Sequence, residues 1–89
     1  MKAVITVVGK DTVGILADVS AICAKNAANV SDVTQSIMSD IFAMIMIIEI
    51  DKLTCTFTEL KQQLNDLGER RNLQIYLMHE DIFNSMHTI

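Results

Sequence analysis

The chain has 89 residues, 51% of them hydrophobic, and carries a formal charge of -4 with an isoelectric point near 4.8. This length allows one hydrophobic core and excludes two domains. The acidic balance argues against a domain that grips nucleic-acid phosphates, because such binding needs clustered Lys and Arg. The longest apolar run, residues 41–48, is much shorter than the ~20 residues of a membrane helix. We therefore expect one soluble domain, residues 1–89, that binds neither nucleic acid nor membrane.

The first predicted elements are a strand and a helix joined by a polar turn. Residues 2–8 are β-branched or small and apolar on both alternating faces, which is typical of a central strand buried on two sides. Asp11 stands where a helix N-cap belongs. The following apolar residues recur at the spacing of one helical stripe: Ile15, Val19, Ile22 and Cys23.

The next two elements form a predicted hairpin. Residues 30–38 alternate, with Val33 and Ile37 on one face and polar side chains on the other, which predicts a half-exposed edge strand. Ser39 and Asp40 give a turn signal. Residues 41–50 are apolar on both faces and therefore predict a second strand that needs cover on two sides.

A second helix, a last strand and a third helix follow. Thr56 and Glu59 match a capping box, and the stripe of Phe57, Leu60, Leu64 and Leu67 continues from it. This helix either stops at Gly68 or runs through it to Arg71, since a glycine costs only about 1 kcal/mol inside a helix. Residues 73–78 predict the last strand. An apolar stripe with acids in its first turn predicts a C-terminal helical extension over residues 79–89.

The order β-α-β-β-α-β predicts an α+β, ferredoxin-like fold, with a four-stranded antiparallel sheet and two helices on one face. The two right-handed crossovers place the first and third strands at the centre, which are the two strands that are apolar on both faces. The other sheet face needs a lid. We expect the C-terminal helix to cover it in the same subunit or in a partner, because bare strands this apolar form an adhesive patch.

The turn before the first helix is the candidate recognition site. A helix start leaves backbone N–H groups unpaired, and Gly14 carries no side chain to keep a ligand from them. Those N–H groups suit a carboxylate, and Asp11 suits an ammonium, so an α-amino acid satisfies both. Each residue also has a purely structural interpretation: Asp11 as an N-cap, Gly14 for close packing, and Asn29 as the end of a turn.

With this element order and the turn formed by residues 11–16, the chain resembles the ACT domain, a ferredoxin-like regulatory module that commonly binds amino acids. The tail, residues 79–87, looks like the C-terminal signature of stand-alone, uncharacterised microbial ACT proteins, which are similar to the ACT repeats of the glycine cleavage system regulator. The resemblance implies a ligand between the first turn of one chain and the start of the second strand of another. Val13 departs from the pattern, because many ACT turns place Pro there. The implied ligand-binding residues are Asp11, Thr12, Val13, Gly14, Ile15 and Asn29.

Other functions have less support in the residues. Acylphosphatases share this fold but need an Arg in the first turn, where this chain has Lys10 and Asp11, so we expect no enzyme. His79 and His87 are too far apart along a helix to hold one ion, so we expect no metal and no cofactor. Cys23 and Cys55 lack CxxC spacing, and no secretory region opens the chain, which predicts the reducing cytoplasm. The apolar strand surfaces predict a twofold homodimer, either sensing an amino acid or similar small molecule at its interface or acting as a ligand-free dimerisation module.

Overall fold

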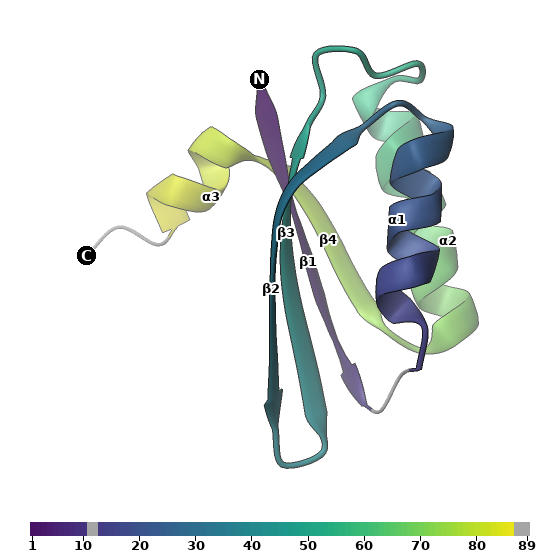
Figure 1. The fold of residues 1–89 in the computed structure, drawn as a ribbon, viewed down its shortest axis with the longest axis vertical. Helices are drawn as coiled ribbons and strands as arrows, with labels where there is room; N and C mark the ends of the chain where they lie inside the picture. The colour runs from purple at the N-terminus through teal and green to yellow at the C-terminus, as the bar shows by residue number, and fades with distance from the viewer. Residues whose placement is uncertain (11–12, 87–89) are drawn as a thin grey trace.

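The computed structural model describes residues 1–10 and 13–86 of the chain. Its elements follow the predicted order, with a third helix at the end (Figure 1). They are β1 (Lys2–Lys10), α1 (Ile15–Lys25), β2 (Asn29–Met38), β3 (Ile41–Glu49), α2 (Phe57–Arg71), β4 (Gln74–His79) and α3 (Glu80–Met86).

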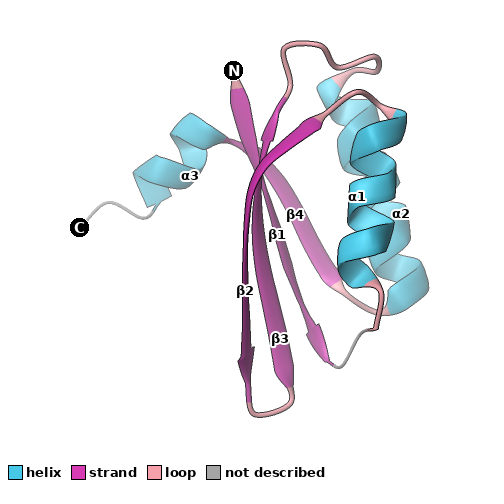
Figure 2. Cartoon of the chain, in the orientation of Figure 1, coloured by secondary structure: helices cyan, strands magenta, loops and turns pink. Residues whose placement is uncertain are grey.

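The four strands form one antiparallel sheet in the order β2-β3-β1-β4. Both α1 and α2 cover the same face of this sheet, and α3 lies on the other side (Figures 1 and 2). The predicted ferredoxin-like architecture is therefore confirmed, including the central positions of the first and third strands. Residues on the two faces of a strand are buried by what packs on those faces, and here α1 and α2 cover one face of the sheet while α3 contacts β1 on the other.

The core lies between the sheet and the two helices. Alternate residues of each strand point toward the helices, since successive side chains of a strand face opposite sides. The largest fully buried side chains of this core are Ile5, Val7, Ile15, Val19, Cys23, Met44, Met46, Ile48, Leu60 and Leu64. The predicted stripes of both helices supply half of this list, so the helical periodicity is confirmed.

Helix α1 begins later than the sequence indicated. Its N-cap is Gly14, in the left-handed conformation with φ 83°, and no side chain within residues 1–10 and 13–86 makes a capping hydrogen bond there. The predicted N-cap at Asp11 is therefore wrong, because the helix begins at Ile15 and a left-handed glycine turns the chain into it. Asp11 and Thr12 themselves lie outside the described residues.

Helix α2 begins as predicted and runs past its glycine. The Thr56 hydroxyl accepts from the Glu59 backbone N–H at 3.0 Å, and the Glu59 carboxylate accepts from the Thr56 N–H at 3.0 Å, so the capping box is confirmed. The helix continues through Gly68 to Arg71 and ends at the left-handed Asn72.

A buried amide joins the two helices at one end. Asn26, the C-cap of α1, is 5% exposed. Its Nδ2 donates to the Ile22 carbonyl and to the Gln63 Oε1 of α2, both at 2.8 Å. No local pattern in the sequence predicts this link between Asn26 and Gln63. Because a buried amide without partners is costly, these bonds fix how the end of α1 meets α2.

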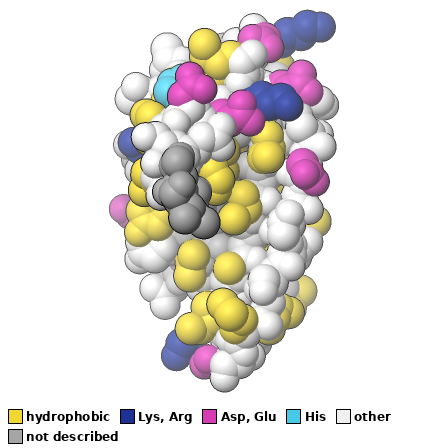
Figure 3. Space-filling view, turned by 90° about the vertical axis from the view of Figure 1, so that its left-hand side faces the viewer, with side chains coloured by type: hydrophobic (Ala, Val, Ile, Leu, Met, Phe, Trp, Pro, Cys, Tyr) yellow, Lys and Arg dark blue, Asp and Glu magenta, His cyan; other side chains and the backbone are white. Residues whose placement is uncertain are grey.

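The sheet face opposite α1 and α2 is only partly covered. Helix α3 contacts β1 and β4, and Val4 on this face is 1% exposed. None of the residues of α3 is buried, so this helix covers only part of the sheet face. Hydrophobic side chains gather across this face, with charged ones concentrated toward one end (Figure 3). Large apolar residues exposed on this face or on the β2–β3 hairpin include Val8, Ile37, Met38, Ile41 and Ile45.

Candidate functional site

The β1–α1 turn presents an open backbone surface. Val13 is 89% exposed, whereas Ile15 is 2% exposed and anchors the start of α1 in the core. A Cβ placed on Gly14 would meet no other described atom within 4 Å. The close-packing interpretation of Gly14 is therefore wrong within this chain. Its left-handed conformation explains the glycine, and no described residue fills the space beside it.

The backbone at the start of α1 favours a negatively charged group. The first turn of any helix has backbone N–H groups without intrahelical acceptors, and the peptide dipoles make this end partly positive. No side chain in the described part of the chain caps these groups in α1. The Gly14 carbonyl accepts from the Asp18 N–H at 3.0 Å, which closes the first helical turn.

Arg71 reaches this turn from the end of α2, and the sequence did not reveal it. Its Nη1 donates to the Asp18 carboxylate in the first turn of α1, and its Nη2 donates to the Val13 carbonyl. These partners are 53 and 58 residues away in sequence. The only signal was a pair of adjacent arginines, which does not identify a partner.

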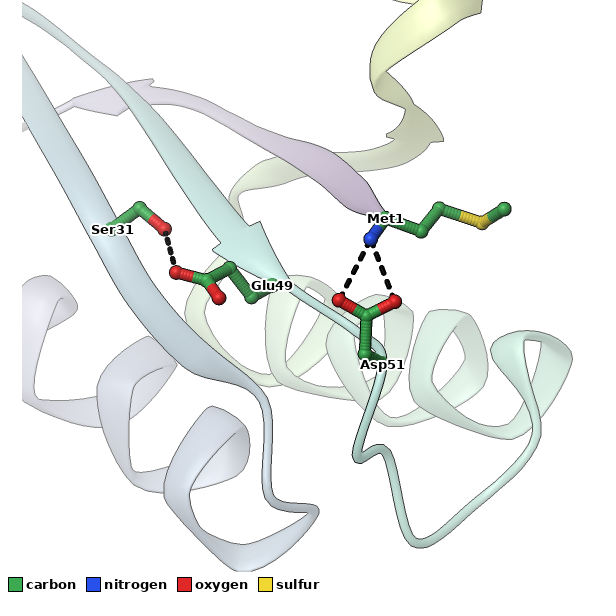
Figure 4. A network of polar contacts seen from close by, with 4 residues as sticks. All are labelled: Met1, Ser31, Glu49 and Asp51. Atoms are coloured by element: carbon green, nitrogen blue, oxygen red, sulfur yellow. Dashed lines mark hydrogen bonds and ion pairs between the residues drawn. The ribbon is translucent and has the colours of Figure 1, made fainter.

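Asn29 lies in a different polar group, at the start of β2. The Asn29 amide lies 3.5 Å from the Glu49 Oε2, and the Ser31 hydroxyl donates to the same oxygen at 3.0 Å. Beside them the amino terminus of Met1 contacts both oxygens of Asp51 at 2.7 Å (Figure 4). Asn29 also borders a shallow hollow between α1 and β2.

The predicted ligand residues do not meet within one chain. Val13, Gly14 and Ile15 adjoin one end of α1, and Asn29 lies beyond its other end (Figure 1). An 11-residue helix spans about 16 Å, which is longer than a single amino acid can bridge. Asp11 and Thr12 fall outside the described residues. A site that uses both ends of α1 therefore requires two chains.

The other titratable groups that the structure describes do not gather into a second site. Burial raises the pKa of the Cys23 thiol to about 11, which makes it a poor nucleophile. Burial, and then the charge of Glu59, raise the pKa of Cys55. Within residues 1–10 and 13–86, no three His, Cys, Asp or Glu side chains are grouped to hold a metal ion. None of the described helices is both long and apolar enough to cross a membrane.

Comparison with known proteins identifies relatives along nearly the full length. The sequence profile of the ACT domain matches residues 2–77. The UPF0237 protein of Methanocaldococcus jannaschii is 42% identical over 88 residues, covering 99% of this chain and 98% of the relative. An ACT domain protein from Streptococcus pneumoniae superposes with a TM-score of 0.80 at 34% identity, covering 100% of this chain and 97% of that one. A protein assigned as a glycine cleavage system transcriptional repressor gives a TM-score of 0.71 at 25% identity, over 85% of this chain and 43% of that one.

Proposed function

Because this chain belongs to the ACT domain family, we propose that it binds an amino acid or a similar small molecule between two copies of itself. ACT domains are generally regulatory domains that bind small ligands, and they often dimerise. The proposal assigns this chain a sensing role rather than catalysis. It also places the chain in the cytoplasm, where its two free thiols would stay reduced.

The observation that carries this proposal is the open space beside Gly14. The left-handed glycine lies at the start of α1, which no described side chain caps, and a Cβ there would meet no described atom within 4 Å. Backbone N–H groups at such a helix start can donate to a ligand carboxylate. The acidic side chain of Asp11 is proposed to pair with the ligand's ammonium group. Thr12 and Val13 are proposed to lie beside the ligand, and Ile15, whose side chain is buried in the core, to contribute its backbone N–H.

The position of Asn29 is the reason for placing the ligand between two chains. Asn29 lies across the length of α1 from Gly14 in the same chain, so we assign the ligand to Gly14 of one copy and Asn29 of the other. The Asn29 amide already lies near Glu49. An arriving ligand would exchange this weak, exposed contact for one with its own polar groups.

Thermal unfolding in the presence of each common amino acid tests the proposal. A ligand at a hundred times its Kd adds about 2.7 kcal/mol of stability, which raises the Tm of an 89-residue domain by on the order of 10 °C. We expect one amino acid, or a few related ones, to produce this shift. The absence of a shift with all of them would reject amino-acid sensing.

Two substitutions at Gly14 separate binding from backbone strain. Gly14→Ala should cost about 1 kcal/mol, because a Cβ is unfavourable at φ 83°. Gly14→Asn should cost less, since Asn tolerates this conformation, although its side chain is larger. Isothermal titration should show that both variants lose ligand affinity, with Asn the more strongly impaired. Unchanged affinity in Gly14→Asn would exclude the space beside Gly14 as the ligand site.

The alternative is a dimerisation module without a ligand. The exposed apolar side chains of the open sheet face and the β2–β3 hairpin favour it, because such surfaces associate whether or not a small molecule is present. Its signature is a stable dimer in sedimentation equilibrium together with no thermal response to any amino acid.

A further inference from the structure

The guanidinium of Arg71 spans the two sides of the glycine turn. One of its nitrogens donates to the carbonyl of Val13, immediately before Gly14, and another to the carboxylate of Asp18, four residues after it. The Arg71 side chain is 30% exposed and that of Asp18 is 41% exposed. The contact therefore forms at a partly shielded position, where an ion pair is screened less than at the open surface.

Apart from Arg71, the described residues hold this turn through the buried side chain of Ile15 and the hydrogen bond from the Asp18 N–H to the Gly14 carbonyl, and neither contact involves the Val13 carbonyl. Glycine has the widest conformational freedom of any residue type, none of the described side chains caps α1, and Val13 is 89% exposed. An arginine is suited to hold this turn because its planar guanidinium donates to two acceptors at once and keeps them in a fixed geometry. A lysine has one ammonium group and cannot impose that geometry.

We propose that Arg71 is a positioning residue for ligand recognition, which rests on the function proposed above. By holding the Val13 carbonyl and Asp18 together, it keeps the N–H groups at the start of α1 directed into the open space beside Gly14. Arg71 acts through the turn and does not itself contact the ligand. The end of α2 thus determines whether the start of α1 is ready to bind.

Amide hydrogen exchange in the unliganded protein tests the positioning directly. In Arg71→Gln we expect exchange in residues 13–18 to rise about five-fold, the factor expected for losing a partly exposed ion pair, with the rest of the chain unchanged. Arg71→Lys keeps the charge near Asp18 but not the planar guanidinium, so it should also raise exchange at the turn. If only the positive charge of Arg71 mattered, Arg71→Lys would keep the wild-type exchange rate in residues 13–18. That result would overturn the proposal.

The neighbouring arginine provides a matched control. The Arg70 side chain is exposed and makes no hydrogen bond or ion pair within the described part of the chain, so Arg70→Gln removes the same charge without touching the turn. It should leave the exchange of residues 13–18 unchanged. An equal rise in both variants, or a rise spread over the whole molecule in Arg71→Gln, would contradict a positioning role.

Ligand affinity completes the test. If an amino acid binds the wild type, Arg71→Gln should weaken it about five-fold or more, and Arg70→Gln should not; equal affinities of the two variants would overturn the inference. If no amino acid binds the wild type, the proposed function fails. Increased exchange confined to the turn would still support positioning of the turn by Arg71, and unchanged exchange would reject it.

Discussion

The two cysteines differ in how deeply their thiols are buried. Cys23 is fully buried against the sheet, and its pKa is raised to about 11, whereas Cys55 is only half-buried before α2. The thiolate is the reactive form of cysteine, and the reagent must be able to reach it. We therefore expect iodoacetamide at pH 8 to modify Cys55 in the native protein and to leave Cys23 unmodified. Mass spectrometry after iodoacetamide treatment measures both sites.

The matching variant is Cys55→Ser. It should leave the native protein unmodified by iodoacetamide, while denaturation should expose Cys23 and allow one modification. Rapid modification of Cys23 in the folded variant would show that α1 opens readily from the sheet, contrary to the packing described here.

At the scale of the element, Gly68 is a tight contact rather than a weak point of α2. A Cβ at this position would lie 2.8 Å from the Leu73 carbonyl oxygen, a backbone atom that a side-chain rotation cannot remove. Gly68→Ala should therefore destabilise the protein by about 1–3 kcal/mol, although alanine favours a helix by about 1 kcal/mol. Urea unfolding measures the change.

Asn65→Ala is the control for this prediction. Asn65 is exposed on the same helix, so its replacement adds helix propensity without a clash, and stability should hold or rise slightly. A stable Gly68→Ala variant would mean that β4 shifts to accommodate the methyl group.

The elements also differ in how well the sequence predicted them. Helix α2 carried its own start signal, because Thr56 and Glu59 satisfy each other's backbone within four residues. The start of α1 carried no such signal. There the cap is the backbone conformation of Gly14, and the acid at position 11 was the stronger statistical candidate. Ile37 lies on the predicted apolar side of β2, yet it is 75% exposed.

At the scale of the whole molecule, α3 partly covers the open sheet face. Helix α3 contacts β1 and β4, where Val4 is 1% exposed. Deleting residues 80–89 should uncover this face, lower the Tm by several degrees and increase aggregation. Differential scanning fluorimetry and light scattering measure these effects. Unchanged Tm, solubility and oligomeric state would show that α3 is not a lid.

The sequence by itself determined the element order, both helical stripes, the capping box and the central strands, because each depends on side chains a few residues apart and on the alternation of faces. It also identified the exposed turn around Gly14. Only the tertiary structure decided that Arg71 holds this turn, that Asn26 joins α1 to α2, and that Gly14 and Asn29 lie at opposite ends of one helix. These features join or separate residues far apart in the chain, and the packing of the helices on the sheet, which no local pattern specifies, sets the distances between them.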